Sequence, residues 1–391
     1  MHLLLASVSS AIAPSGVCRH AANLARGIAA HPAVSRVTLL VGEWQASYFR
    51  DAFGLNDMGL DIRPVAIANT PVARNLWCLR GLPAVARERE ADVVHLAFPM
   101  PVLRSAHAAP VVASVHDLYP FDMPSNFGRK AWLNRAATRL CLHNVDAVAC
   151  VSEGTRSRLH ELFPLLAPQK TSVIPNAVYL SNPDERASLP PELEDFPFLL
   201  CVAQHRANKN LPLLLQAFQL ALGRKDLPRE MKLVLVGNEG PETRAILSVV
   251  AEYRLGPRIV LMSGISDGLL ASLYARCELV VAPSVLEGFG LPVAEALAAS
   301  CRVVGSDIPA FRALASTGCV FFDPTDTTGE SLATAFRKVL SMPRPTLSSS
   351  STLDPRQVAG MYLALYSRLL SSRLMRHDAS STVDLSLPGD L

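Results

Sequence analysis

The feature that most constrains this chain is a regular alternation of short apolar runs with longer segments of helical periodicity, from the N-terminus to about residue 340. Strands that alternate with helices along a chain pair in parallel and are covered by helices on both faces of the sheet. In the first half, the apolar runs predict strands at residues 3–8, 37–41, 93–96, 111–115, 147–151 and 172–174. In the second half, they predict strands at residues 198–202, 232–236, 259–261, 279–282, 302–305 and 320–322. The pattern therefore predicts an α/β fold.

Two such series imply two domains, because 391 residues exceed what one ordinary hydrophobic core can cover. A stretch rich in Pro and acidic residues separates the series and is typical of a linker. We expect two tandem, doubly wound, Rossmann-like domains that face each other across a cleft. The predicted boundaries are 1–180 for the N-terminal domain, 181–196 for the linker, 197–342 for the C-terminal domain, 343–373 for a second link with a helix at 357–370 that packs back on the N-terminal domain, and 374–391 for a disordered tail.

Charge and hydropathy argue against several classes of protein. The formal net charge is +3, which is too small to indicate nucleic acid as a partner. No apolar run approaches the roughly 18 residues that span a bilayer. The first residues, MHLLLASVSSAIA, have no positive segment before a short apolar run, so they predict a buried strand rather than a signal peptide. The eight Cys residues are scattered singly, as in reduced proteins, and we expect a cytoplasmic location.

The most informative segment is PSVLEGFGLPVAEALAA, residues 283–299, which follows a predicted strand and opens a predicted helix. Gly288 and Gly290 allow a tight turn and a close approach of the backbone to a ligand. The amides near Gly290 and Leu291 would then lie at a helix N-terminus, where a phosphate group is stabilised.

Two carboxylates belong to the same segment. Glu287 lies before the helix and can accept hydrogen bonds from sugar hydroxyls, whereas Glu295 lies within the helix and can hold a ribose diol. The alternative is an ordinary strand-to-helix turn with solvated carboxylates. Spacing alone leaves both interpretations open.

A second segment, CVAQHRANKN, places Arg206 and Lys209 in a polar loop between a predicted strand and a predicted helix. A diphosphate leaving group needs cations to offset the charge that develops on it. A Lys that opens a helix is electrostatically unfavourable, which favours a ligand as the reason for Lys209. The alternative is a solvated basic loop.

Two further candidates lie in the first domain. His116, in SVHDLYP, follows a predicted strand at its carboxyl end, where a role in polar chemistry and a structural role are both open. Gly16 lies in the first strand-to-helix turn, where a loop for an acceptor or a phosphate would be. One glycine is a weak signal, and the dinucleotide fingerprint G-x-G-x-x-G is absent.

The segment GRKAWLNRAATRLCLHN, residues 128–144, predicts a helix with basic residues around an apolar face. Such a helix can rest on an anionic membrane surface, and it can equally be an ordinary amphipathic surface helix. The sequence has no D-x-D pair for a metal–diphosphate and no H-x-x-x-H pair for a transition metal. We therefore expect no metal and no cofactor.

Together these segments resemble family 4 of the retaining glycosyltransferases, which adopt the GT-B fold. In the second domain the resemblance runs through QHRANKN, KLVLVGNEG, SGISDGLLASLYARCELVVAPSVLEGFGLPVAEALAA, SDI and FFDPTD. In the first domain it includes SVHDLYP, AVACVSEGTRSRL and VIPNAV, so it covers the chain from residue 1 to about residue 340.

The resemblance implies roles for single residues. The implied catalytic residues are His116, near the transferring sugar, and Glu287, on the donor sugar. The implied donor-binding residues are Arg206, Lys209, Gly264, Ile265, Glu287, Gly288, Phe289, Gly290, Leu291 and Glu295, and Gly16 belongs to the acceptor or phosphate loop. Lys209 and the amides of residues 289–291 would meet the diphosphate, Glu295 the ribose, and Gly264 and Ile265 the base. The family often has Gly-Arg where this chain has Ala203-Gln204, so Arg206 is the candidate for a second cation.

The implied function is metal-independent, retaining transfer of a hexose, with mannose as one candidate, from a nucleotide diphosphate sugar. The implied acceptor is a glycan or a lipid-linked glycan in cell-surface polysaccharide biosynthesis, such as that of lipopolysaccharide or exopolysaccharide. A cytoplasmic enzyme that rests on the inner face of the plasma membrane through residues 128–144 would suit such an acceptor. Two alternatives are a nucleotide-sugar 2-epimerase on the same fold and a non-catalytic nucleotide-sugar-binding partner.

Overall fold

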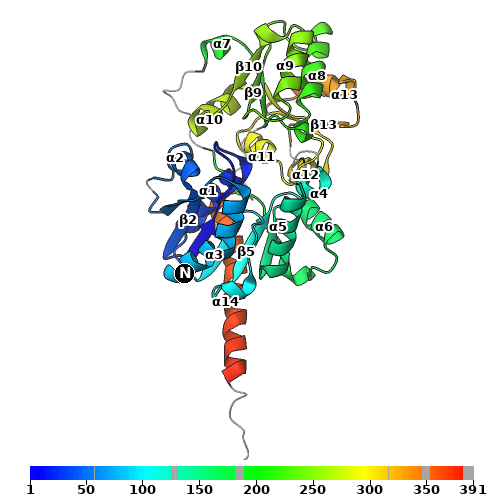
Figure 1. The fold of residues 1–391 in the computed structure, drawn as a ribbon. Helices are drawn as coiled ribbons and strands as arrows, with labels where there is room; N and C mark the ends of the chain where they lie inside the picture. Colours follow the sequence, from blue (N-terminus) through cyan, green and yellow to red (C-terminus); the bar gives the residue numbers. More distant parts are fainter. Residues whose placement is uncertain are drawn as a thin grey trace, which may run out of the picture.

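A computed structural model describes residues 1–56, 58–124, 128, 131–180, 189–315, 317–345 and 353–381, with side chains as far as Arg373. In these ranges the chain forms two parallel sheets with helices around them, one sheet in each domain (Figure 1). This confirms the predicted α/β fold with two Rossmann-like domains. Parts of the predicted links, residues 181–188 and 346–352, lie outside the described residues.

The first sheet has the strand order β3-β2-β1-β4-β5-β6-β7. Its strands are β1 (His2–Ala6), β2 (Arg36–Gly42), β3 (Asp61–Val65), β4 (Val93–Leu96), β5 (Val111–Val115), β6 (Ala147–Cys150) and β7 (Thr171–Val173). The strand order reverses between β1 and β4, where Leu3 pairs with Val93. Ligands of such sheets bind beyond the carboxyl ends of the strands at this reversal.

The edge strand β3 is the one strand of the described part of this sheet that the apolar runs do not predict. Arg63 and Pro64 are exposed, and Val65 is its buried residue. A proline is tolerated at a sheet edge because its missing N–H is not needed for a ladder. The edge position thus explains why this strand carries no apolar run.

The second sheet has the order β10-β9-β8-β11-β12-β13. Its strands are β8 (Phe198–Val202), β9 (Lys232–Val236), β10 (Ile259–Met262), β11 (Leu279–Ala282), β12 (Val303–Ser306) and β13 (Cys319–Phe322). Each corresponds to a predicted strand within about one residue. The order reverses between β8 and β11, where Leu199 pairs with Leu279, so both sheets carry a reversal that can position a ligand.

Helices connect the strands in both domains. In the first domain they are α1 (Gly16–Ala29), α2 (Ala46–Arg50), α3 (Pro71–Glu88), α4 (Tyr119–Asp122), α5 (Ala131–Asn144) and α6 (Glu153–Leu162). In the second they are α7 (Pro191–Glu194), α8 (Leu211–Gly223), α9 (Thr243–Glu252), α10 (Asp267–Arg276), α11 (Leu291–Ala298), α12 (Pro309–Leu314) and α13 (Glu330–Leu340).

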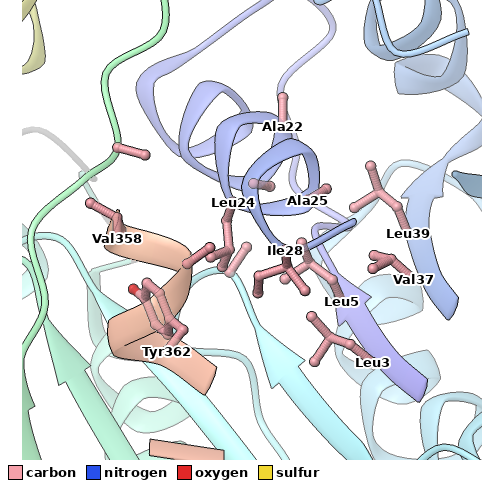
Figure 2. Packing of buried hydrophobic residues seen from close by; sticks show 14 of the residues in the cluster. Leu3, Leu5, Ala22, Leu24, Ala25, Ile28, Val37, Leu39, Val358 and Tyr362 are labelled. Atoms are coloured by element: carbon pink, nitrogen blue, oxygen red, sulfur yellow. The ribbon is translucent and has the colours of Figure 1, made fainter. Parts of the chain in front are cut away.

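The last helix, α14 (Pro355–Ser381), lies against the first domain rather than the second (Figure 1). Val358 and Tyr362 share a buried core with Leu24 and Ile28 of α1 (Figure 2). The helix extends past residue 374, where the sequence predicts a disordered tail to begin. The Ser and Asp residues there favour disorder, but the Leu, Met, Arg and Ala between them are strong helix formers. Residues 382–391 lie outside the described residues.

The basic segment 128–144 is seen mainly as α5. Cys141 and Leu142 are buried, whereas the side chain of Trp132 is 65% exposed. Residues 129 and 130, which carry part of the predicted basic rim, lie outside the described residues. In the part of the chain that the structure describes, every helix is too short or too polar to cross a membrane.

Candidate functional site

The two domains meet at the turn before α11. Ser152 Oγ and Thr155 Oγ1, from the first domain, donate hydrogen bonds of 2.6 and 3.2 Å to the carbonyl oxygen of Gly288. A Cβ atom on Gly288 would lie 1.6 Å from the carbonyl oxygen of His116. Gly288 was predicted to let the backbone approach a ligand closely, and the close neighbour seen in the structure is the backbone of the first domain.

The next two residues fix the start of α11. Phe289 is 7% exposed and packs with Val151 of the first domain. Gly290 caps the helix at φ +92°, a conformation that favours glycine, and a Cβ atom there would lie 2.6 Å from the Phe311 ring. Pro292 has no N–H, so the predicted phosphate donors at this helix start are the amides that precede it.

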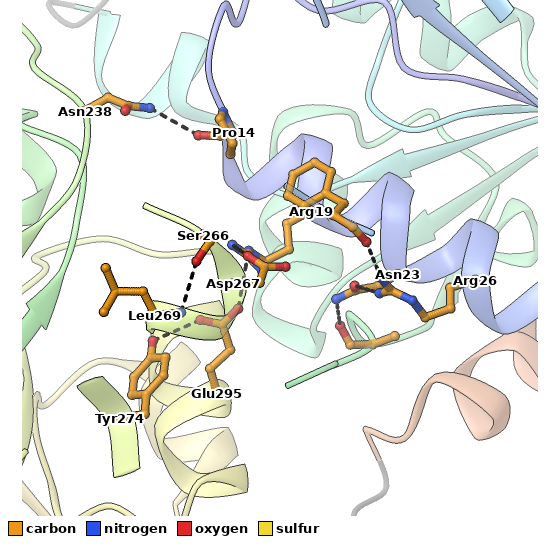
Figure 3. A network of polar contacts seen from close by, with 12 residues as sticks. Pro14, Arg19, Asn23, Arg26, Asn238, Ser266, Asp267, Leu269, Tyr274 and Glu295 are labelled. Atoms are coloured by element: carbon orange, nitrogen blue, oxygen red, sulfur yellow. Dashed lines mark hydrogen bonds and ion pairs between the residues drawn. The ribbon is translucent and has the colours of Figure 1, made fainter. Parts of the chain in front are cut away.

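The first-domain loop lies beside the same helix start. Gly16 opens α1, and a Cβ atom on it would lie 3.9 Å from Leu291 Cδ1. The loop is tied to the second domain by Asn238 Nδ2, which donates a 3.1 Å hydrogen bond to the carbonyl oxygen of Pro14 (Figure 3). The structure thus brings together Gly16 and the predicted phosphate-binding helix start, although more than two hundred and seventy positions separate them in the sequence.

Glu287 lies between a cation of its own domain and a hydroxyl of the other. Lys209 Nζ forms an ion pair with Glu287 Oε1. The single proton of Tyr119 Oη is shared between Glu287 Oε2 at 3.2 Å and the carbonyl oxygen of Leu286 at 3.0 Å. The Lys209 and Glu287 side chains are 17% and 11% exposed, so both charges are largely shielded from water and pair strongly.

The loop that carries Lys209 is shaped by two asparagines. Asn210 adopts a left-handed conformation at φ 49°, which Asn tolerates better than most residues, and α8 begins directly after it. Asn208 is fully buried, and its Nδ2 donates to Tyr119 Oη at 3.2 Å. The backbone N–H of Val285 donates to the carbonyl oxygen of Asn208 at 2.9 Å, which joins this loop to the turn that carries Glu287.

His116 is held in one tautomer. Its Nε2 lies 2.9 Å from the carbonyl oxygen of Ala97, and because a carbonyl only accepts, the proton is on Nε2 and Nδ1 is an acceptor. Burial lowers the pKa of His116 to about 4, against the opposing effect of the Ala97 carbonyl. The imidazole is therefore neutral at pH 7. Its ring meets that of His20 edge-on at 4.4 Å.

Asp117, the neighbour of His116, was not among the predicted site residues. Its Oδ1 accepts a 3.1 Å hydrogen bond from the backbone N–H of Tyr119. Burial, together with the charge of Glu287, raises the pKa of Asp117 to about 6, against the Tyr119 hydrogen bond and the charges of Lys209 and Arg206, which lower it. This carboxyl therefore belongs to the same electrostatic cluster as Glu287.

Arg206 lies at the rim of this cluster. It is exposed, while its charge still acts on Asp117 and Tyr119. The ion pair with Glu287 is made by Lys209 instead. A small cavity of about 10 Å³ lies at the carboxyl ends of β8 and β11, lined in part by Ala203, Ser284 and Glu287.

Glu295 lies deeper in α11 and belongs to a second polar cluster (Figure 3). It is 4% exposed, and Tyr274 Oη donates to its Oε2 at 2.9 Å. Burial raises the pKa of Glu295, whereas Arg19 and the Tyr274 hydrogen bond lower it. Arg19 Nε, from the first domain, lies 3.6 Å from Glu295 Oε1, and Arg19 Nη2 donates to Asp267 Oδ1 at 2.8 Å.

The predicted base-binding residues precede this cluster in the chain. Gly264 has φ +64°, which a side chain would strain, and Ile265 is partly buried against the second core. Ser266 then caps α10, with its Oγ accepting from the N–H of Leu269 at 3.2 Å. Gly264 and Ile265 thus lie two to three positions before Asp267. Asp267 is linked to the first domain by its hydrogen bond from Arg19.

Sequence reasoning missed Tyr119, Asn208, Asp117 and Arg19. The first three lie within three positions of His116 or Lys209, so their polar character near predicted residues was an available signal. Arg19 carried none, because its partners lie 248 and 276 positions away.

Comparison with known proteins follows the same division into two domains. Residues 14–182 match the family model described as Glycosyltransferase Family 4, and residues 184–351 match the model described as Glycosyl transferases group 1. Together these two models cover most of the chain.

Two curated bacterial relatives are similar over part of their length. The O-antigen chain mannosyltransferase RfbU of Salmonella typhimurium is 25% identical over 232 residues, which are 58% of this chain and 61% of that protein. The N-acetylgalactosamine-N,N'-diacetylbacillosaminyl-diphospho-undecaprenol 4-alpha-N-acetylgalactosaminyltransferase of Campylobacter jejuni is 30% identical over 185 residues, 47% of each protein. The similarity thus spans less than two thirds of either relative.

Among solved structures, Anabaena HepE in complex with UDP and glucose has a similar fold. The TM-score is 0.63 at 17% identity, with 98% of this chain and 99% of that chain covered. At this identity the likeness concerns the fold. The two family matches, the two-sheet architecture and the interdomain contacts at Gly288 agree, and the chain therefore belongs to the GT-B glycosyltransferases, with a family 4 first domain and a group 1 second domain.

Proposed function

We propose that this chain is a retaining, metal-independent glycosyltransferase that moves a hexose from a nucleotide diphosphate sugar to a glycan or lipid-linked glycan. The observation that carries the proposal is the cluster of Lys209, Glu287 and Tyr119, which joins both domains beside His116. Paired charges at a domain interface, next to the N-terminus of α11, suit a negatively charged donor that both domains enclose.

The diphosphate would be held by Lys209 and by the amides that precede Pro292. Charge develops on the diphosphate as the bond to the sugar breaks, and these groups are positioned before the reaction starts. Each preorganised group of this kind typically lowers a barrier by roughly 3 kcal/mol. Arg206 is the proposed second cation, because its charge already acts on the same cluster.

Glu287 and His116 would orient the sugar. Glu287 is ion-paired with Lys209, and its carboxylate can accept sugar hydroxyls once Lys209 turns to the diphosphate. His116 is neutral, and its Nε2–H donates a hydrogen bond to the carbonyl oxygen of Ala97. Its Nδ1 can therefore accept a hydrogen bond from the sugar. Glu295 would bind the ribose diol, with Gly264 and Ile265 beside the base.

The relatives suggest the substrates. RfbU is described as an O-antigen chain mannosyltransferase, which makes mannose the first donor sugar to test. The name of the Campylobacter relative contains diphospho-undecaprenol, a lipid carrier. This supports a lipid-linked acceptor and cell-surface polysaccharide synthesis. A cytoplasmic enzyme at the inner membrane face fits that acceptor, and the exposed Trp132 of α5 offers a contact point.

The proposal is tested with purified protein, GDP-mannose and a panel of UDP-sugars. Thermal shift identifies the donor, since a ligand at 100 times its dissociation constant adds roughly 2.7 kcal/mol of stability. Transfer is then measured on a lipid-linked acceptor, with and without EDTA, and NMR gives the anomeric configuration of the product. We expect retention, no effect of EDTA, and no conversion of the donor when acceptor is omitted.

The decisive variant is Glu287→Ala, with Glu252→Ala as its control. Glu287→Ala should lower the transfer rate by at least about 100-fold while the protein stays folded. Glu252 is exposed on α9, so its removal should leave the rate unchanged. Full transfer by Glu287→Ala would overturn the site, and conversion of the donor to its 2-epimer would favour the epimerase alternative.

A further inference from the structure

Arg19 is a first-domain cation whose ion-pair partners lie in the second domain. It projects from the first turn of α1 and meets Asp267 Oδ1 at 2.8 Å and Glu295 Oε1 at 3.6 Å (Figure 3). All three side chains are well shielded, with exposures of 17%, 13% and 5%. The contact therefore depends on the two domains being close together.

The position of the Arg19 guanidinium coincides with a place that the proposed function reserves for the donor. Glu295 is the proposed ribose ligand, and Ile265, two positions before Asp267, is proposed to meet the base. A guanidinium that bridges Asp267 and Glu295 lies between these two elements. The nucleoside would have to occupy the same region.

The two oxygens of Glu295 differ in what they bind. Oε2 already accepts the Tyr274 hydroxyl at 2.9 Å, within the second domain. Oε1 faces Arg19 at 3.6 Å, which is an ion-pair distance and too long for a strong hydrogen bond. A ribose hydroxyl would make a shorter bond at Oε1, so this oxygen is the one that changes partner.

Glu295 needs a positive partner to remain ionised. It is almost fully buried, and burial raises its pKa, while the nearby Asp267 charge raises it as well. Arg19 opposes both effects by neutralising the two carboxylates. An ionised Glu295 is the form that can accept both hydroxyls of a ribose.

We propose that Arg19 is a further residue of the donor site that occupies the place of the ribose at Glu295 until a nucleoside diphosphate displaces it. This inference rests on the proposed function. The hydrogen bond from Arg19 to Asp267 does not involve the ribose ligand, so it can persist and keep the domains together over the bound donor. Arg19 thereby links occupation of the second-domain site to the position of the first domain.

The expected consequence is that Arg19 weakens the measured affinity for nucleotide. The apparent affinity equals the intrinsic affinity multiplied by the fraction of protein in which the binding position is free. Arg19→Ala should therefore bind UDP or GDP, whichever the wild type binds, about tenfold more tightly. Isothermal titration calorimetry of both proteins under the same conditions measures this directly.

Three variants keep the test interpretable. Arg19→Gln removes the charge but can still donate to Asp267, so it repeats the measurement if Arg19→Ala does not fold. Arg26→Ala is the matched control, because Arg26 lies on the same helix and contacts Asn23 at 3.0 Å and the Tyr179 ring at 3.7 Å, away from Glu295. Glu295→Ala should lose nucleotide binding.

The outcomes separate the two proposals. Tighter nucleotide binding by Arg19→Ala or Arg19→Gln, with Arg26→Ala unchanged, supports the inference. Equal or weaker binding by the folded Arg19 variants overturns it and leaves the proposed function intact. If the wild type binds neither UDP nor GDP while its thermal unfolding shows a folded protein, both proposals are overturned.

Discussion

Tyr119 Oη donates a hydrogen bond of 3.2 Å to Glu287 Oε2, although the two residues lie in different domains and 168 positions apart. The same hydroxyl accepts a hydrogen bond from Asn208 Nδ2 at 3.2 Å. The carboxylate on which the proposed chemistry depends is thus oriented by the first domain. A site built in this way is complete only when the two domains are in contact.

Tyr119→Phe should therefore reduce transfer without unfolding the protein. A hydrogen bond to a charged group typically contributes about 1.5–3 kcal/mol, which corresponds to a loss in kcat/KM of roughly 10- to 100-fold. Steady-state kinetics and thermal unfolding check this. Tyr253→Phe is the control and should keep full activity, because Tyr253 follows α9 and packs against a hydrophobic core of the second domain. Unchanged kinetics in Tyr119→Phe would show that the hydroxyl does not orient Glu287.

Gly288→Ala should separate donor binding from transfer. The new Cβ would overlap the carbonyl oxygen of His116, at 1.6 Å. Both Gly288 and this carbonyl are backbone groups in packed segments, so a small local shift does not relieve the overlap. The domains must move apart instead, while Lys209 and Glu295 remain in the second domain. We expect nucleotide binding to survive, transfer to fall by at least about 100-fold, and small-angle X-ray scattering to show a larger radius of gyration.

The control for that variant is Gly256→Ala, where a Cβ atom would meet nothing within 4 Å. It should leave both scattering and transfer as in the wild type. Wild-type transfer by Gly288→Ala would mean that the domain contact at His116 is not needed for the reaction.

Asp117→Asn should change how stability depends on pH. Burial raises the pKa of Asp117 to about 6 from an ordinary value of 3.8, so between these values the folded protein holds a proton more tightly than the unfolded chain. This residue's contribution to stability is therefore lost as pH rises through that window, by about 3 kcal/mol at pH 7. Asp117→Asn should raise the melting temperature at pH 7 and above, whereas Asp195→Asn, on the surface, should not. Equal melting temperatures would contradict the role of burial.

Much of the fold could be predicted because each element carries its own local pattern. Apolar runs of four to seven residues mark buried parallel strands whatever their partners are, so the central strands were found. Strand β3 was missed because Pro64 and Arg63 suit a sheet edge and not a core. The predicted tail begins at residue 374, whereas α14 continues to Ser381, because composition alone does not show that a segment follows directly on a helix.

The candidate site could be predicted only for polar residues that follow the end of a recognisable strand. Lys209, Glu287 and His116 each stand at the carboxyl end of a strand, and parallel sheets bring such ends together. Their partner Tyr119 and the cation Arg19 act across the domain interface, and no spacing in the sequence encodes which residues of one domain face the other. The glycine at 288 was predicted for a ligand, and its closest neighbour is the first domain.

The buried histidines of the first domain should make the protein sensitive to acid. His95 Nε2 and His20 Nε2 lie 2.9 and 3.2 Å from Ser114 Oγ, which also lies 3.0 Å from Tyr362 Oη of α14. Burial, with the charge of His116, lowers the pKa of His95 to about 3, and burial lowers that of His116 to about 4 and that of His20 as well. Between these values and pH 6.5 the unfolded chain binds more protons than the folded one.

Stability should therefore fall as pH drops from about 6.5 toward 4, by about 1.4 kcal/mol per pH unit for each histidine that stays neutral. Asp117 and Glu295 act in the opposite direction, but the histidines outnumber them, since burial also lowers the pKa of His107 to about 4, so the histidines dominate. His95→Gln should reduce the slope of unfolding free energy against pH by about one proton, as measured by urea unfolding at a series of pH values. His143→Gln, on the exposed face of α5, should leave the slope unchanged. An identical slope in His95→Gln would mean that the buried network accepts protons before the first domain unfolds.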